Sequence, residues 1–387
     1  NFGWDMGSID NYSQTTSSKK YLARIDYNIN DNHKLTLRYS HHDSKSYQLI
    51  SNSSSGNTAG NGNRNNSANA ISGQNTGYQI QDNTRSFVAE LNSNFRGKFS
   101  NKLIGTYNKQ IEDRAYLTSV FPTIDILANG GVGSSTYTSV GFDPFTPDNR
   151  LNYSTTNITD NFTIYKGKHT ITVGAGYEHF ISNNLFFYAS NGVWVYNSIK
   201  DFETAALAYK ANPNLTTSPV AISRFNYRYT LLPAGQKPWQ QLKVNTISWY
   251  AQDEYQVKRN FKATAGIRFD YISVPGSAAS QYFNPVVDSF TFNKPDGSTM
   301  KINTSQMPAS KVYISPRAGF NWDVFSNKTL QVRGGTGIFT GRVPYVWIVG
   351  QSGNSGMLQI TQSFNTQATT FGPFNPSVGY YRPLTPP

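Results

Sequence analysis

Apolar and polar residues alternate along ten stretches of this chain. Every second residue is apolar or aromatic from Tyr21 to Tyr27, and the same rule holds from Ile171 to Tyr177 and from Ala263 to Phe269. Successive side chains of a β-strand point to opposite faces, so a period of two predicts strands with one apolar face. The predicted strands lie near residues 18–30, 34–48, 83–97, 101–115, 154–166, 168–190, 243–257, 261–275, 312–325 and 329–340.

The connections between these strands alternate in length. Turns of three or four residues join the members of each pair, at 31–33, 97–100, 166–168, 258–260 and 326–328. Long polar segments separate or follow the pairs, at roughly 49–82, 116–150, 191–242, 276–312 and 341–387. Short turns at one end and long loops at the other are typical of a transmembrane β-barrel.

A soluble antiparallel sandwich would show the same alternation. The predicted strands are about ten residues or longer, against the five or six that soluble sheets usually have. Their apolar positions are rich in Tyr, Phe and Trp, and the loops are too long for a compact soluble domain. We therefore expect an all-β fold: an antiparallel, up-and-down transmembrane β-barrel wall with long extracellular loops.

Composition supports the barrel. Only 37% of the residues are hydrophobic, whereas 14% are aromatic, and the mean hydropathy is −0.51. A barrel with a polar lumen needs apolar residues on one face only, and aromatic side chains favour the membrane–water boundary. Disorder is the alternative explanation of low hydrophobicity, and the alternation argues against it outside residues 51–75. The sequence contains no run of 18 apolar residues, so it predicts no transmembrane helix.

Charge and motifs give little functional signal. The net charge of +12 is compatible with an acidic partner such as lipopolysaccharide, or with Lys and Arg scattered over turns, strand ends and lumen. The absence of any run of five like charges favours scattering, and no nucleic-acid-binding module is recognisable. The chain has no cysteine, its five histidines are dispersed, and no catalytic or nucleotide-binding motif occurs. We expect no catalytic residue, metal or cofactor, and no enzyme.

Three loop segments have a readable character. Residues 51–75 are mostly Asn, Ser and Gly, which predicts a flexible surface loop. Residues 201–210 predict a short helix that starts from Asp201 as its cap and ends before Asn212. Residues 288–302 predict a hairpin around Pro295-Asp296-Gly297. Such ordered elements suggest a shaped external surface.

Two groups of residues are candidates for contact with a ligand. Aromatic side chains in the loops are the first group, with loop-on-loop packing or membership of the outer aromatic girdle as the alternative: Trp194, Tyr196, Trp239, Tyr345 and Trp347. Charged residues predicted to face the lumen are the second, with pairing across strands as the alternative: Arg24, Arg38, Glu90, Glu178, Arg268, Asp270 and Arg333.

Several strands resemble those of TonB-dependent outer-membrane receptors. Residues 258–270, KRNFKATAGIRFD, are similar to that family's K-x-N-L-T-x-x-x-G-L-R-Y-D strand, and 249–255, WYAQDEY, to its Y-x-Q-D-x-W strand. Residues 315–323 and 335–344 resemble the next hairpin. The Gly341-Arg342-Val343-Pro344 segment, with 21–27 and 33–36, points to the Oar-like branch. The order and spacing of these motifs make the resemblance more specific than any one of them.

The resemblance implies a function that the alternation alone does not. Such receptors have a barrel of about 22 strands plugged by an N-terminal domain, and they import scarce ligands with energy delivered by TonB. Residues 1–387 would then be part of an outer-membrane barrel, without the plug domain. Implied partners are outer-membrane lipid and lipopolysaccharide, an unknown imported ligand, and a plug and TonB through the rest of the parent chain.

Two alternatives remain open. One is a structural or docking barrel for a surface or secreted partner, without import. The other is an outer-membrane enzyme on a smaller, self-contained barrel.

Three structural expectations follow. The long loops should lie at one end of the wall and the short turns at the other. The apolar positions should face lipid and be exposed: Tyr21, Ile25, Leu35, Leu37, Phe87, Leu91, Ile171, Val173, Ile267 and Phe269. The first and last strands should not pair to close a barrel, because strands outside the chain would complete it.

Overall fold

The main element is one large antiparallel sheet. The computed structural model describes residues 2–128, 135–275, 282–364 and 372–382. Ten strands pair in the order β1-β2-β4-β5-β8-β9-β12-β13-β16-β17. Their bounds are β1 (Thr16–Asn30), β2 (His33–Gln48), β4 (Tyr78–Phe95), β5 (Phe99–Ala115), β8 (Asn149–Lys166), β9 (His169–Phe186), β12 (Gln240–Lys258), β13 (Phe261–Ser273), β16 (Lys311–Asp323) and β17 (Gln331–Gly337). The all-β, antiparallel barrel-type fold expected from the sequence is confirmed.

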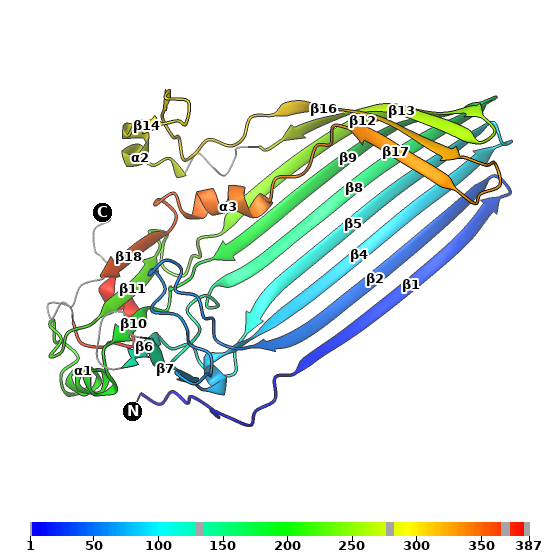
Figure 1. The fold of residues 1–387 in the computed structure, drawn as a ribbon. Coiled ribbons are helices and arrows are strands. Elements are labelled where there is room, and N and C mark those ends of the chain that lie inside the picture. The colour runs from blue at the N-terminus through cyan, green and yellow to red at the C-terminus, as the bar shows by residue number, and fades with distance from the viewer. Residues whose placement is uncertain (1, 129–134, 276–281, 365–371, 383–387) are drawn as a thin grey trace.

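The two kinds of connection lie at opposite ends of this sheet. Because each strand pairs with the next of the ten along the chain, the tight turns share one end and the long loops share the other (Figure 1). This arrangement agrees with the first structural expectation. One turn is longer than expected, since residues 324–330 separate β16 from β17. No helix in the described ranges is both long and apolar enough to cross a membrane.

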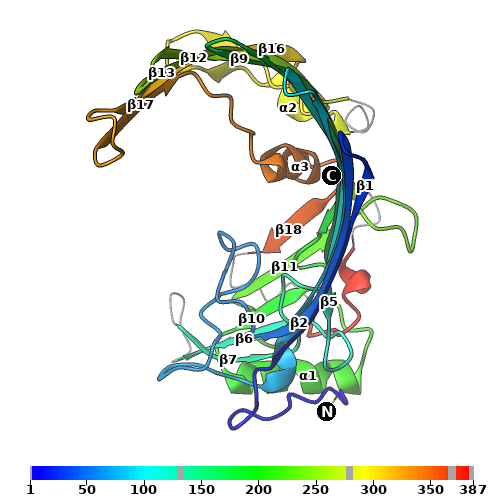
Figure 2. The same ribbon diagram turned by 90° about the vertical axis from the view of Figure 1, so that its right-hand side faces the viewer.

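The sheet is a curved wall and not a closed barrel. Figure 2 shows it as an arc, seen from one end of the strands. Within the described residues β1 pairs only with β2, and β17 only with β16. The first and last strands therefore do not pair with each other, as expected. An open edge leaves a row of unpaired backbone groups, which hydrocarbon does not tolerate.

The strand register sorts the two faces of the wall. Tyr39 lies opposite Ala23 on one side and Phe87 on the other, and Phe87 lies opposite Tyr107. None of the ten apolar residues expected to face lipid is buried. Five are clearly exposed: Tyr21, Ile25, Phe87, Val173 and Ile267. Helix α3 (Tyr345–Gly353) lies on the concave side of the wall (Figure 2). Arg342, just before this helix, contacts Glu178, which belongs to the polar face. The polar face is therefore concave, and the apolar face is convex.

Aromatic residues form two rows on the convex face. Phe87 and Phe95 lie eight residues apart on β4, Phe99 and Tyr107 on β5, and Phe261 and Phe269 on β13. Eight residues span roughly 27 Å of strand. In a strand tilted by about 40° they span about 20 Å along the membrane normal, close to the height of about 25 Å of a lipid-facing band. The spacing fits aromatic girdles at the two membrane boundaries.

Two of the carboxylates on the convex face, Asp160 and Asp253, lie among its apolar residues. Asp160 accepts a hydrogen bond from Asn101 Nδ2 at 2.8 Å, and Asp253 lies 2.6 Å from His169 Nδ1. By register, both acids share the face of Leu103 and Ala265, which lie directly opposite them. Each has a polar partner on a neighbouring strand, which lowers the cost of placing it on this face.

Four of the long loops fold together into a second sheet, which we call the cap. Its order is β18-β11-β10-β6-β7-β3, with parallel pairs β10–β6 and β3–β7. The strands are β3 (Ile71–Ser72), β6 (Thr123–Leu127), β7 (Thr136–Val140), β10 (Val193–Tyr196), β11 (Arg224–Tyr229) and β18 (Ile360–Phe364). Helix α1 (Ile199–Ala211) and the 3₁₀ turns η1 (Gln74–Thr76) and η4 (Val378–Tyr381) accompany them. The cap lies at the loop end of the wall (Figure 1).

The cap has its own hydrophobic core. Trp194 and Tyr196 of β10, Phe225 of β11 and Phe374 are fully or almost fully buried in it, with Ala205 of α1. All four residues of β10 are buried. Burial of such aromatic side chains stabilises this end of the molecule by about 1.5–3 kcal/mol each. The loops are therefore ordered by a core and not only by their attachment to strands.

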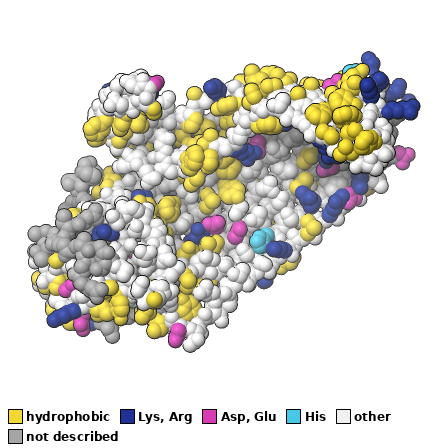
Figure 3. Space-filling view, in the orientation of Figure 1, with side chains coloured by type: hydrophobic (Ala, Val, Ile, Leu, Met, Phe, Trp, Pro, Cys, Tyr) yellow, Lys and Arg dark blue, Asp and Glu magenta, His cyan; other side chains and the backbone are white. Residues whose placement is uncertain are grey.

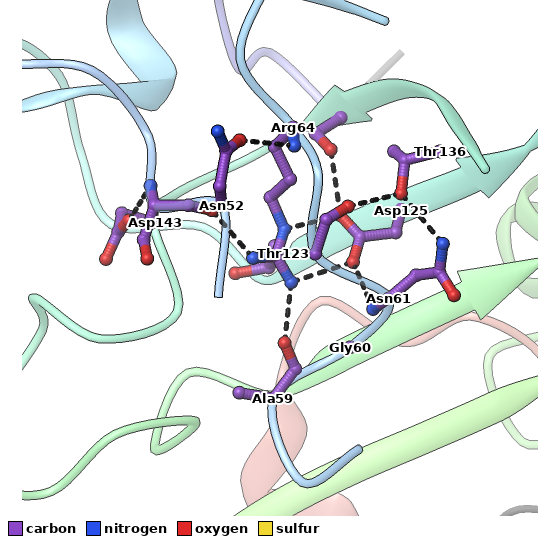
Figure 4. Close-up of polar contacts among 12 residues, drawn as sticks. Asn52, Ala59, Gly60, Asn61, Arg64, Thr123, Asp125, Thr136 and Asp143 are labelled. Atoms are coloured by element: carbon purple, nitrogen blue, oxygen red, sulfur yellow. Dashed lines mark hydrogen bonds and ion pairs between the residues drawn. The ribbon is translucent and has the colours of Figure 1, made fainter. Parts of the chain in front are cut away.

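A buried ion pair fixes residues 51–64 to this core (Figure 4). Arg64 and Asp125 both have side chains with 0% exposure, and Arg64 Nε and Nη2 each lie 2.8 Å from one Asp125 oxygen. The Arg64 Nη1 donates to the carbonyls of Ser51 and Ser53. The expectation of a flexible loop at 51–75 is thus wrong for this part, because composition does not reveal a charge partner 61 residues away.

The other two loop expectations are largely right. Helix α1 covers residues 201–210, but its cap is Ser198, whose hydroxyl accepts from the Asp201 backbone N–H at 3.1 Å. Asp201 lies in the first turn and is not the cap. The hairpin within 288–302 exists as β14 (Phe292–Asn293) and β15 (Thr299–Met300), with α2 (Pro285–Ser289) before it.

Candidate functional site

The charged residues expected to face the lumen share one face of the wall. Arg24 lies opposite Arg38, and Thr36, two residues from Arg38, lies opposite Glu90. Further along, Tyr250 lies opposite Arg268 on one side and Gly174 on the other. Glu178 lies four residues after Gly174, so it shares the face of Arg268. Asp270 and Arg333 follow by the same alternation. This is the concave face, which Figure 2 shows turned toward α3.

Most of these charges have partners on that face. Arg24 pairs with Asp26 at 2.7 Å, and Lys102 with Glu90 at 3.2 Å. Arg268 pairs with Asp270 at 2.8 Å. Of these three pairs, only Glu90–Lys102 crosses between strands, which is the alternative to a ligand path that the sequence left open. The other two join residues two apart on one strand. Arg24–Asp26 and Glu90–Lys102 are open to solvent, and such pairs contribute little to stability. The Asp270 side chain, in contrast, is mostly buried.

One hollow on the concave face brings several of these residues together. It has a volume of about 750 Å³ and lies between the 338–348 segment and strands β12, β13 and β16. Three guanidinium groups line it, with Asp270 as the one carboxylate: Arg268, Arg317 and Arg342. Arg342 also donates to the Glu178 carboxylate. The described lining therefore carries an excess of positive charge.

Aromatic rings accompany these guanidinium groups. The Arg317 guanidinium carbon lies 4.8 Å from the centre of the Phe339 ring, and that of Arg268 lies 5.3 Å from the Tyr250 ring. Tyr345 lines the hollow from α3. A stacked guanidinium such as that of Arg317 keeps a hydrogen-bonding edge available for carboxylate or phosphate oxygens. The Nε edge of Arg268 is already occupied by Asp270. The hollow is suited to a ligand with anionic and apolar parts.

The five aromatic candidates divide by exposure. Trp194 and Tyr196 are 0% exposed in the cap core, so a ligand does not reach them, and loop-on-loop packing describes them. Tyr345 packs against Phe180, with ring centres 4.5 Å apart, and also borders the hollow. Trp239 and Trp347 are exposed, Trp347 at 70%. All five were chosen because they are aromatic residues in long loops, and these two criteria did not separate buried rings from exposed ones.

Arg317, Arg342 and Phe339 were not among the candidates from the sequence. A signal for Arg317 existed, because it alternates with Ala318 and Phe320 and so falls on the polar face of its strand. Arg342 and Phe339 follow β17 in a segment without alternation, and the sequence offered only the family-like motif around them. The described residues contain no group of three or more His, Asp or Glu side chains that could hold a metal ion.

Solved structures that are similar to this chain include two transporters and an import receptor. The unliganded ferric citrate transporter FecA aligns with a TM-score of 0.46 at 12% identity, over 89% of this chain and 39% of its own. The open form of the ferric-catecholate import receptor Fiu from E. coli K12 gives 0.45 and 10%, over 87% and 49%. The FrpB iron transporter from Neisseria meningitidis gives 0.40 and 14%, over 79% and 35%. The chain spans less than half the length of each.

The family assignment comes from the sequence. No curated protein matches this chain. Residues 6–387 match the family described as outer membrane beta barrel domain. That match covers all ten strands of the wall and the six strands of the cap. The chain therefore belongs to the outer membrane beta barrel domain family and lies in the bacterial outer membrane.

Proposed function

We propose that this chain is the wall and loop region of a TonB-dependent receptor of the Oar-like branch, which imports a scarce ligand. The single observation that carries the proposal is the sorting of the wall into an apolar convex face and a polar concave face with a basic, aromatic hollow. A purely structural barrel does not need such a hollow. The family-like motifs in β12, β13 and β16 support the same function.

The partners follow from that proposal. A plug domain would lie against the concave face, and TonB would act on the plug from the inner side. The concave residues Arg24, Arg38, Glu90, Glu178, Arg268, Asp270 and Arg333 would line the ligand path or hold the plug. Trp239 and Trp347 would meet the ligand at the loop end. Lipid and lipopolysaccharide would contact the convex face.

Uptake in living cells tests the proposal. The receptor is purified from cells, and small molecules that accompany it are identified by mass spectrometry. Accumulation of the identified compound is then measured in cells with and without functional TonB. Energised import predicts accumulation that is lost without TonB or without the receptor. Accumulation that persists at the same level in both strains would contradict import.

A docking function is the second candidate, and one observation favours it. The loop that carries α2 and β14 exposes Phe283, Val286, Phe290 and Met300. Hydrophobic side chains gather on this projecting lobe (Figure 3), and exposed apolar patches mark contact surfaces. Cross-linking from Val286 on intact cells distinguishes the two functions. A docking barrel gives one protein adduct and no TonB-dependent uptake.

A further inference from the structure

A second cavity lies where the cap meets the rim of the wall. It has a volume of about 460 Å³. Asn149, Asn184 and Gln240 line it from the loop ends of β8, β9 and β12, and Arg228 lines it from β11. Helix α3 forms a further side, between the wall and the strands β11 and β18 (Figure 1). This cavity is separate from the hollow of the concave face, with which it shares no lining residue.

Arg228 is the charged residue of this cavity. It is 5% exposed, and its guanidinium lies 3.7 Å from the centre of the Tyr188 ring. Its nitrogens donate to the Tyr188 hydroxyl, to Gln359 Oε1 at 2.9 Å and, more weakly, to Asn354 Oδ1 at 3.5 Å. All of these partners are neutral, and Nε has no hydrogen-bond partner.

No carboxylate neutralises Arg228 among the described residues, since none forms an ion pair with it within 4.0 Å. The residues outside the described ranges include no Asp or Glu. Burial lowers the pKa of Arg228, and the Tyr188 hydroxyl is the group that opposes this shift. A buried charge without a counter-ion is costly, so proteins pair such charges.

Arg64 in the same cap provides the comparison. It is fully buried, and the Nε/Nη2 edge of its guanidinium meets both oxygens of Asp125. Two further carbonyls accept from Nη1. The cap thus compensates one buried arginine completely and leaves the other, at a cavity wall, with neutral partners only. The difference marks Arg228 as a group positioned for an external anion.

We propose that this cavity binds a small organic carboxylate through Arg228. A planar carboxylate matches the guanidinium fork, and charge-assisted hydrogen bonds of this kind are the strong ones. The amides of Asn149, Asn354 and Gln359 lie in the same lining and supply further donors, while Phe186 and Tyr188 supply apolar walls. The binding needs no energy source, so it stands apart from the proposed import.

Helix α3 offers a way to block the cavity without touching Arg228. Val346, Val349, Gly350 and Gly353 line it, and their spacing places them on one helix face. A Cβ built at Gly350 meets no heavy atom within 4 Å. Gly350→Leu therefore adds a side chain on the cavity side and also improves helix propensity.

Calorimetric titration of the detergent-solubilised receptor tests the proposal, with succinate as the probe. Neutral succinamide controls for charge and inorganic phosphate for a different oxyanion. Arg228→Met keeps much of the volume and removes the charge. Lys210→Gln makes the same charge change at the exposed end of α1. Hydrogen exchange of β10 and β11 reports whether each variant keeps the cap folded.

We expect wild type to bind succinate and not succinamide. In Arg228→Met the dissociation constant for succinate should rise about tenfold or more, as expected for loss of a charged hydrogen bond. Gly350→Leu should weaken binding to a similar degree, and Lys210→Gln should change it by less than about twofold. If Arg228→Met unfolds the cap, Gly350→Leu decides. Unchanged binding in Gly350→Leu, equal binding of succinamide, or binding of phosphate alone would overturn the proposal.

Discussion

For single residues on the wall, the face of the strand decides what a substitution costs. Leu91 lies on the convex face of β4. It is midway between Phe87 and Phe95, which belong to the two aromatic rows. Leu103 lies directly opposite it, and the next residue along β5, Ile104, lies on the concave face opposite Glu90. Leu91 therefore meets lipid, whereas Ile104, on the neighbouring strand, meets the lumen.

Leu91→Lys should destabilise the protein in a bilayer by about 2–4 kcal/mol, because a lysine is placed in hydrocarbon. Ile104→Lys should change stability by less than about 1 kcal/mol, since its ammonium faces Glu90 across the strand pair. Urea unfolding from lipid vesicles measures both. Equal losses in the two variants would contradict the assignment of faces.

The buried pair of Arg64 and Asp125 gives a second prediction at this scale. Arg64→Met should destabilise the cap by about 3–5 kcal/mol, because it leaves the Asp125 carboxylate buried without its cation. Hydrogen exchange should accelerate in β6, β10 and β11 and remain slow in β8 and β9, which belong to the wall.

The double variant Arg64→Met with Asp125→Leu is the control for that experiment. It removes both charges, so it should recover a large part of the lost protection. Protection in the cap that is the same in Arg64→Met and wild type would show that the pair does not hold the loop.

At the scale of elements, alternation predicted the long strands and missed the short ones. The wall strands were visible because each exposes one face to lipid and the other to a polar space, as at Ile267 and Arg268. Strand β10 is buried on both faces, so Val193-Trp194-Val195-Tyr196 has no alternation to read. Its partners β6 and β11 come from distant parts of the chain, and local sequence does not encode that pairing.

The candidate site divides in the same way. The strand residues Arg268 and Asp270 could be assigned to the concave face from period two alone. Arg342, Phe339 and Arg228 could not, because their roles depend on how loops pack after the strands have formed. The resemblance to a receptor family supplied the expected function. The cavities form only where the folded loops pack against the wall.

Helix α1 allows a test of its observed cap. Ser198→Ala should cost about 1 kcal/mol of local stability, because the backbone N–H of residue 201 loses its acceptor. Hydrogen exchange at that amide should accelerate. Asp201→Ala should leave the same amide protected, since the Ser198 hydroxyl remains. Faster exchange at residue 201 in Asp201→Ala alone would restore Asp201 as the cap.

At the scale of the whole molecule, the loops and turns give the wall two unlike ends. One end carries only short connections, and the other carries a cap whose core is built from four loops. In an outer-membrane barrel, short turns face the periplasm and long loops face outward. The central claim is that this chain spans the outer membrane with its cap outside.

Cysteine labelling of intact cells tests that claim directly. The chain contains no cysteine, so single residues can be introduced at Lys210 of the cap and at Lys98 of the β4–β5 turn, both exposed. A membrane-impermeant maleimide should label Lys210→Cys in intact cells, and Lys98→Cys only after the outer membrane is permeabilised. Labelling of Lys98→Cys in intact cells, or protection of Lys210→Cys, would contradict the account.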